Sequence, residues 1–177
     1  MSLTVAHQVR LAGIPAIAVN DTYQLAPWAN MLYAADEAWW ARHPGALDFR
    51  GLKVSVGTIK GVLHIEQSSV VAGFDPNPDR ICTGSNSGYQ ALHIAVHAGA
   101  KRILLCGFDM RGDHWFGRHP RELANTNEVL FARFRRNFGI LAPILVKRGI
   151  EVVNCTPGSA LTCFQTMGLG DALSANV

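Results

Sequence analysis

The feature that most constrains the fold is the regular alternation of short apolar runs with helical patterns along the chain. Strands that alternate with helices form parallel sheets, because a parallel connection needs a crossover long enough to hold a helix. The predicted strands span residues 14–19, 30–35, 102–106 and 151–155. We therefore predict an α/β fold of the Rossmann-like kind, with a doubly wound, mainly parallel sheet.

Several weaker patterns complete this prediction. Residues 37–42 form a short helical pattern whose Trp39 and Trp40 we expect to pack in the core. The remaining predicted elements are short strands over 52–56 and 62–65, a loop over 74–80, a helix over 125–148 kinked at Pro143, and a short helix through Phe164. No linker divides the chain, so residues 1–177 are predicted to form a single domain.

Composition places the chain among folded proteins of ordinary size. Of its 177 residues 49% are hydrophobic and 16% are charged, which excludes a disordered chain. The net charge of +3 gives no strong nucleic-acid signal. No stretch approaches the roughly 20 apolar residues of a membrane span, and no signal peptide is evident, so we expect a soluble cytoplasmic protein. The sequence leaves open whether the chain forms a homo-oligomer.

The four cysteines are predicted to be reduced and mostly buried. Cys82, Cys106, Cys155 and Cys163 show no CxxC spacing, so neither a structural zinc site nor a disulfide framework is expected. Cys106 and Cys155 are expected to be buried and reduced, within adjacent or near-adjacent strands. Free cysteine is among the most frequently buried residues.

Polar residues gather where the predicted strands end. Asn20 and Asp21, Asp36, Asp109, and Asn154 with Ser159 follow four apolar runs. Ligands of open parallel sheets bind beyond the carboxyl ends of the strands, so this convergence indicates a binding site. Taken singly, each of these residues could equally cap a helix or close a turn.

A Gly-Ser loop opens the helical pattern that is stopped by Gly99. It consists of Gly84, Ser85, Asn86, Ser87 and Gly88. A helix N-terminus offers unpaired backbone N–H groups, glycines allow close approach of a ligand, and the serines add hydroxyl donors, which together favour a phosphate. The alternative is that a serine only caps the helix and the glycines only shape the turn. The loop has neither the lysine of a P-loop nor the spacing of a dinucleotide fingerprint.

The segment after residue 108 is rich in acids and histidines. His114 and His119 are candidates for a general base, because imidazole titrates near neutral pH. Asp109 and Asp113 could hold Mg²⁺, although no cofactor is required by the pattern. A metal site at the two histidines is disfavoured, because no third ligand stands at a recognisable spacing. His93 and His97 are expected on the surface of the helix.

These motifs together resemble one superfamily. They are the runs AVNDTY at 18–23, GSNSGYQAL at 84–92, GFDM at 107–110 and NCTPGSAL at 154–161. In the same order they resemble the Rossmann-like group of bacterial lipooligosaccharide sialyltransferases and archaeal-type 6-hydroxymethyl-dihydropterin pyrophosphokinases, in particular its phage and prophage members. The resemblance spans nearly the whole chain but does not select the reaction.

The resemblance implies a role for each matching residue. Asn20 would contact the nucleotide, with Ser85, Ser87 and Gly88 over its phosphates and Asp109 beside the donor. His114 or His119 would deprotonate the acceptor hydroxyl, at a shorter spacing than in the sialyltransferases, and Asn154 and Ser159 would lie near the nucleotide. Members of the group usually begin with a strand and a Gly-Pro-Ser-Leu type loop. Here Met1-Ser2-Leu3-Thr4 matches the inside of that loop, so the usual first strand is expected to be missing.

Three functions remain open at this point. The first is a sialyltransferase-like glycosyltransferase that moves a sugar from a nucleotide-sugar donor to a hydroxyl-bearing acceptor. The second is a Mg²⁺-dependent pyrophosphokinase-like transferase, using Asp109 and Asp113. The third is a degenerate, non-catalytic nucleotide-binding module, which the missing first strand favours.

Overall fold

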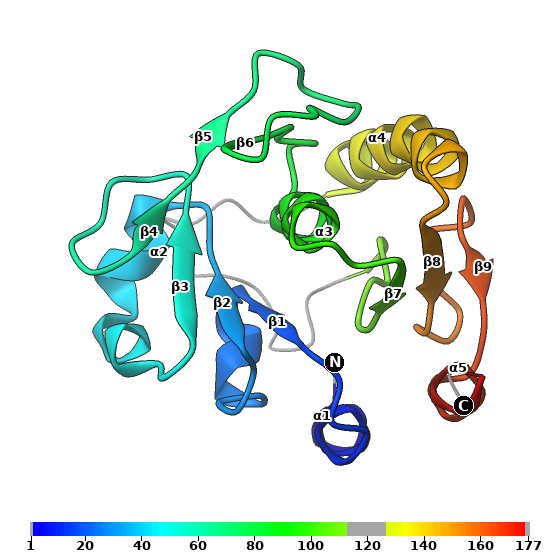
Figure 1. Ribbon diagram of the computed structural model, residues 1–177, viewed down its shortest axis with the longest axis horizontal. Helices are drawn as coiled ribbons and strands as arrows, with labels where there is room; N and C mark the ends of the chain where they lie inside the picture. Colours follow the sequence, from blue (N-terminus) through cyan, green and yellow to red (C-terminus); the bar gives the residue numbers. More distant parts are fainter. Residues whose placement is uncertain (1, 113–126, 176–177) are drawn as a thin grey trace.

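The computed structural model describes residues 2–112 and 127–175 and has a layered α/β architecture (Figure 1). Every strand pairing within these residues is parallel. The predicted class, an α/β fold with parallel strands, is therefore confirmed.

The strands form three parallel groups. The first is a four-stranded sheet in the order β1 (Ile17–Val19), β2 (Met31–Tyr33), β3 (Leu52–Ser55) and β4 (Leu63–His64). The second is the pair β5 (Glu66–Gln67) and β6 (Arg80–Ile81), and the third is the sheet β7 (Arg102–Leu105), β8 (Glu151–Asn154) and β9 (Gln165–Thr166). In register, Ala18 lies opposite Leu32, and Leu104 lies opposite Val153.

The predicted strands are present but shorter at their ends. Residues 14–16 precede β1, and residue 106 lies just beyond β7. The helix α2 (Glu37–Arg42) has the predicted bounds, and its tryptophans are buried as expected. The predicted short helix through Phe164 is wrong: residues 159–164 form no helix, and β9 follows directly.

The longer helices begin at side-chain caps. Ser2, Asn86 and Asn127 each accept a hydrogen bond from an N–H group in the first turn. They open α1 (Leu3–Leu11), which the sequence pattern did not predict, α3 (Ser87–His97), and α4 (Glu128–Lys147), which continues through Pro143. The last helix is α5 (Leu169–Ser174), and two short 3₁₀ helices span Asn20–Gln24 and Pro44–Asp48.

The helices cover opposite faces of the sheets. Ile103 and Leu105 of β7 belong to a core cluster with Phe134 of α4, whereas Leu104 packs with Val5 of α1 around a second cluster on the other face. Figure 1 shows α3 and α4 on one side of the strands and α1 and α5 on the other. The strands therefore lie between two helical layers.

His93 corrects one prediction. We expected it on the surface, but its side chain is fully buried. Its Nδ1 accepts the Cys82 N–H at 3.2 Å, its Nε2 lies 3.2 Å from the Asp75 carbonyl oxygen to which it donates, and its ring stacks on Phe74. The loop between β5 and β6 covers this side of α3, and the helical pattern could not show that. Burial lowers the pKa of His93 to about 4. His97 is half-buried beside it.

The four cysteines are free thiols. Cys82 and Cys155 are buried, and Cys106 and Cys163 are half-buried. Cys106 and Cys155 follow directly on the adjacent, paired strands β7 and β8 instead of lying within them, and Cys106 is half-buried where we expected it to be buried. A hydrogen bond between their side chains, together with burial, raises the pKa of Cys106.

Among the helices of residues 2–112 and 127–175, none combines the length and apolar character needed to cross a bilayer.

Candidate functional site

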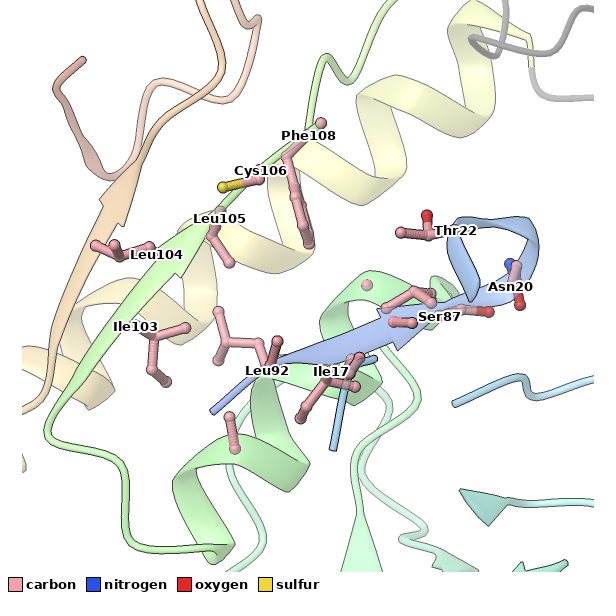
Figure 2. Close-up of a pocket in the computed structure, with 18 of the residues that line it drawn as sticks. Ile17, Asn20, Thr22, Ser87, Leu92, Ile103, Leu104, Leu105, Cys106 and Phe108 are labelled. Carbon is pink, nitrogen blue, oxygen red and sulfur yellow. The ribbon is translucent and has the colours of Figure 1, made fainter. Parts of the chain in front are cut away.

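A cavity of about 1210 Å³ lies between β1 and β7 (Figure 2). Apolar side chains from both strands and from the helices on both faces line most of it. They include Ala6 and Val9 of α1, Ile17 and Val19 of β1, Leu92 of α3, Ile103 and Leu104 of β7, and Phe131 and Phe134 of α4. In Figure 2, Ile17, Leu92 and Ile103 lie around this space.

Polar residues line the end of the cavity where β1 and β7 finish. Figure 2 shows Asn20, Thr22, Ser87 and Phe108 at this end. Of the residues that the sequence predicts for a nucleotide site, the lining includes Asn20, Asp21, Ser85, Asn86, Ser87 and Gly88, together with the predicted catalytic residue Asp109. We call this set the polar mouth. It draws on three separate stretches of the chain, which agrees with the expectation that loops after parallel strands share one edge.

Three predicted residues within the described ranges lie outside this lining: Gly84, Asn154 and Ser159. The predicted histidines His114 and His119, and the possible magnesium ligand Asp113, lie outside the described residues.

The amino end of α3 carries unpaired backbone donors. Asn86 is the N-cap, and its Oδ1 accepts the Tyr89 N–H at 3.0 Å. In the described part of the chain, the N–H groups of Ser87 and Gly88 meet no acceptor, as is usual for the first turn of a helix. These two groups and the partial positive charge of the helix end are available to an anion at the cavity.

The two glycines of the loop have packing reasons of their own. Gly84 has φ +53°, and a Cβ there would overlap the Tyr89 ring. A Cβ on Gly88 would lie 2.6 Å from the Phe108 ring, so this glycine lets α3 approach the segment after β7. Both glycines shape the mouth, and neither by itself indicates a phosphate.

Backbone strain also gathers at the mouth. In the described residues, the non-glycine residues with positive φ are Asn20, Ser85 and Met110, at +49°, +57° and +51°. All three line the cavity. Each such residue costs on the order of 1–3 kcal/mol and persists only where the surrounding structure holds it, which is common at ligand sites. Sequence reasoning singled out Asn20 and Ser85 for other reasons and missed Met110.

Asp21 has internal partners that sequence reasoning did not assign. Its carboxylate accepts the Trp39 indole N–H at 3.3 Å and lies 3.0 Å from His43 Nε2. The His43 ring stacks on Trp39 and its Nδ1 lies 2.7 Å from the Trp39 carbonyl oxygen. Asp21 therefore ties the segment after β1 to α2, in addition to lining the cavity.

The C-terminal polar turn braces the mouth from outside. The Asn154 amide donates to the Leu161 carbonyl and accepts the Thr156 N–H, so it is engaged within the turn. Thr156 Oγ1 accepts the N–H groups of Gly107 at 3.0 Å and Phe108 at 2.9 Å. Ser159 Oγ donates to the Phe108 carbonyl oxygen, and the Ala160 N–H donates to that of Asp109. The turn thus fixes the segment that carries Asp109. Sequence reasoning missed Thr156, although it stands within the NCTPGSAL run.

Three arginines that line the cavity, Arg102, Arg111 and Arg133, were not predicted as site residues. Arg111 and Arg133 are exposed. The neighbouring Arg135 donates to the Met110 carbonyl oxygen at 2.8 Å and pairs with Glu128, which connects α4 to the mouth. Arg111 and Arg133 supply positive charge that suits an anionic ligand.

A metal site finds little support in the described residues. No cluster of three or more histidine, cysteine, aspartate or glutamate side chains there is arranged to hold a metal ion. Asp109 is exposed at the mouth and offers one carboxylate. The second carboxylate that the sequence suggested for Mg²⁺, Asp113, lies outside the described residues.

Comparison with known proteins adds no identification, since no family model, no curated protein and no solved structure matches this chain.

Proposed function

We propose that the polar mouth binds the phosphates of a nucleotide in a Rossmann-like, doubly wound sheet. The observation that carries the proposal is convergence. Residues after β1, at the start of α3 and after β7 line one end of one cavity, and the N–H groups of Ser87 and Gly88 there meet no acceptor among residues 2–112 and 127–175. A phosphate is the ligand that such a helix end binds most readily.

Each part of the mouth has a distinct role in this proposal. The N–H groups of Ser87 and Gly88 and the hydroxyls of Ser85 and Ser87 donate to phosphate oxygens. Arg111 adds positive charge from the segment that follows β7. Asn20 presents an amide that can pair with the sugar or base.

The reaction we propose is transfer of a sugar from a nucleotide-sugar donor to a hydroxyl-bearing acceptor. Cleavage of the donor leaves negative charge on the nucleotide phosphate, and the helix end together with Arg111 stabilises that charge without a metal ion. His114 or His119 would accept the proton of the acceptor hydroxyl, and Asp109 would lie beside the donor. The family resemblance supports these assignments.

Thermal shift with CMP, UDP, GDP and ATP, each with and without Mg²⁺, tests the proposal. A nucleotide that binds only the folded chain raises the unfolding midpoint by mass action. We expect stabilisation by CMP or UDP that does not depend on Mg²⁺. Stabilisation by ATP only in the presence of Mg²⁺ would favour the pyrophosphokinase-like reaction instead. No response to any nucleotide would contradict nucleotide binding.

The doubly substituted variant Ser85→Ala/Ser87→Ala locates the site. We expect it to bind the stabilising nucleotide more weakly by about 1–3 kcal/mol, the usual range for lost hydrogen bonds to a charged group. Ser69→Ala is the matched control, because Ser69 is exposed and does not line the cavity. Equal affinities in both variants would remove the polar mouth as the site. A separate assay identifies the base. If wild type hydrolyses the nucleotide-sugar donor, loss of that activity in His114→Ala or His119→Ala shows which histidine is required.

A further inference from the structure

The cavity separates two strand edges that have no partner. Within residues 2–112 and 127–175, β1 pairs only with β2, and β7 pairs only with β8. Figure 2 shows both arrows running in the same general direction, with the cavity between them. The two sheets therefore have the layout of one parallel sheet from which a strand position between β1 and β7 is empty.

Backbone groups of both strands point into this space. The Ala16 carbonyl accepts the Asn30 N–H from the β2 side, and alternate residues of a parallel strand face opposite neighbours, so the groups of Ile17 face away from β2. By the same reasoning, the Leu105 carbonyl bonds toward β8 and the groups of Leu104 face away from it. Peptide groups on an apolar cavity need hydrogen-bond partners. An alkyl chain or another apolar ligand cannot supply them, whereas a strand supplies them on both sides.

The size of the cavity fits a strand. A residue within a sheet occupies about 160 Å³, from a rise of roughly 3.3 Å, a strand spacing of roughly 4.8 Å and a layer spacing of roughly 10 Å. The cavity of about 1210 Å³, which includes the polar mouth, therefore holds at most about seven residues. Most small-molecule pockets lie between about 300 and 1,000 Å³, so a single nucleotide at the mouth would leave much of this space unfilled.

The side chains of the helices that line the cavity determine which kind of strand can bind there. Leu92 of α3 and Phe134 of α4 line the cavity from one face, and Ala6 and Val9 of α1 line it from the other. A strand in this position meets apolar side chains on both faces. It must itself be apolar on both faces, as strands in the middle of a parallel sheet are.

We call the empty strand position between β1 and β7 the β1–β7 slot. We propose that it binds an extended apolar strand that runs parallel to both edges and is joined to the amino end of α1. The direction of the connections supports the joining to α1. The chain passes from β7 to β8 through α4 and leads away from the slot. A connection from the slot to β1 would cross the sheet in the opposite direction. Because both crossovers are right-handed, the helix of this second connection must lie on the face opposite α4. The helix α1 precedes β1 and lies on the face opposite α4.

The test extends the full chain. A segment of about seven alternating valine and isoleucine residues and a short Gly-Ser link are placed before Ser2, and the monomeric product is compared with the unextended chain. We expect the unfolding midpoint to rise by about 10 °C, because burial of several large apolar side chains far exceeds the cost of ordering the segment. We also expect the exchange of the Ile17 and Leu104 amide protons to slow by a factor of about 100 or more.

A control segment carries proline at alternate positions, which removes the N–H groups that a strand would donate. An equal midpoint shift with this control, or no shift with either segment, would overturn strand binding. The extended chain could instead elute from a sizing column as a dimer in which the same amide protons are protected. That result would overturn the joining to α1, because each copy would then insert its added strand into the other copy. The same apolar segment can also be added as a free peptide to the unextended chain. Slowed exchange of the Ile17 and Leu104 amide protons with the free peptide, but not in the extended chain, would overturn the joining to α1 and indicate a separate partner.

The natural occupant is tested at the level of the gene. The codons that precede the one for Met1 are expected to encode, in frame, an apolar segment of about this length. A stop codon in frame immediately before Met1 would overturn the joined strand. These measurements need no nucleotide, so their failure is distinguishable from failure of the proposed function.

Discussion

Replacing His93 with glutamine should change how the stability of the protein depends on pH. His93 is fully buried in a neutral form, with Nδ1 accepting from Cys82 and Nε2 donating to the Asp75 carbonyl. Its pKa falls from 6.5 to about 4 on folding, mainly because burial penalises the charged ring. Above pH 6.5 the His93 imidazole is uncharged in both the folded and the unfolded chain, so its titration does not change the free energy of unfolding there.

The sign follows from which state binds the proton first. As the pH falls below 6.5 the unfolded chain protonates His93 and the folded chain does not, so the free energy of unfolding decreases. The decrease ends near pH 4, where both states are protonated. A pKa difference of this size corresponds to about 3 kcal/mol of stability.

Urea unfolding at several pH values between 7.5 and about 4 measures the effect. We expect wild type to lose about 3 kcal/mol more than His93→Gln over this range, since all other groups cancel in the difference. A constant offset from lost stacking on Phe74 does not alter this comparison. His7→Gln is the control, because His7 is exposed, and its curve should parallel that of wild type. Parallel curves for wild type and His93→Gln would refute the reasoning.

Three further predictions rest on single contacts. Gly84→Ala should destabilise the fold by about 2–4 kcal/mol in urea unfolding, since its positive φ and the Tyr89 ring exclude a Cβ, whereas Gly45→Ala, with open space around it, should differ little. Thr156→Val should cost about 1–3 kcal/mol and weaken nucleotide binding, because the N–H groups of Gly107 and Phe108 lose their acceptor; exposed Thr58→Val should do neither. Cys106 should react with a thiol reagent at pH 8 far more slowly in the native chain than in urea, because its raised pKa leaves little thiolate; equal rates would contradict this.

The sequence predicted the strands well because burial leaves a strong local signal. Apolar runs marked β1, β2, β7 and β8 to within a few residues, and Glu37–Arg42 was located at both ends. Local signals failed where tertiary structure decides. The pattern of α3 left His93 on a polar side, but a loop that begins after β5 covers that side. The helix α1 has a serine cap, yet its weak amphipathic pattern did not show it.

The polar mouth was predictable in part for the same reason. Strand ends and glycine-rich helix starts are local features, and topology brings them to one edge, so Asn20, Ser85 and Asp109 could be placed together from the sequence. Asn154 and Ser159 also follow a strand, but their polar atoms bond within the C-terminal turn or to the Phe108 carbonyl. No pattern in the sequence distinguishes a side chain that faces a ligand from one that braces a loop. Arg111 and Arg133 escaped notice because isolated exposed cations are common.

Strand binding in the slot and anion binding at the polar mouth are expected to be coupled. A strand between β1 and β7 would end, like its neighbours, at the edge where Asn20, Ser87 and Asp109 lie, because parallel strands share that edge. Its final residues would then face the unpaired N–H groups of α3 across the mouth. The apolar volume behind the mouth would be filled by protein instead of water, which lowers the local dielectric and strengthens every hydrogen bond to a phosphate. Filling the slot and binding an anion are therefore expected to favour one another, since each stabilises the same arrangement of β1, α3 and β7.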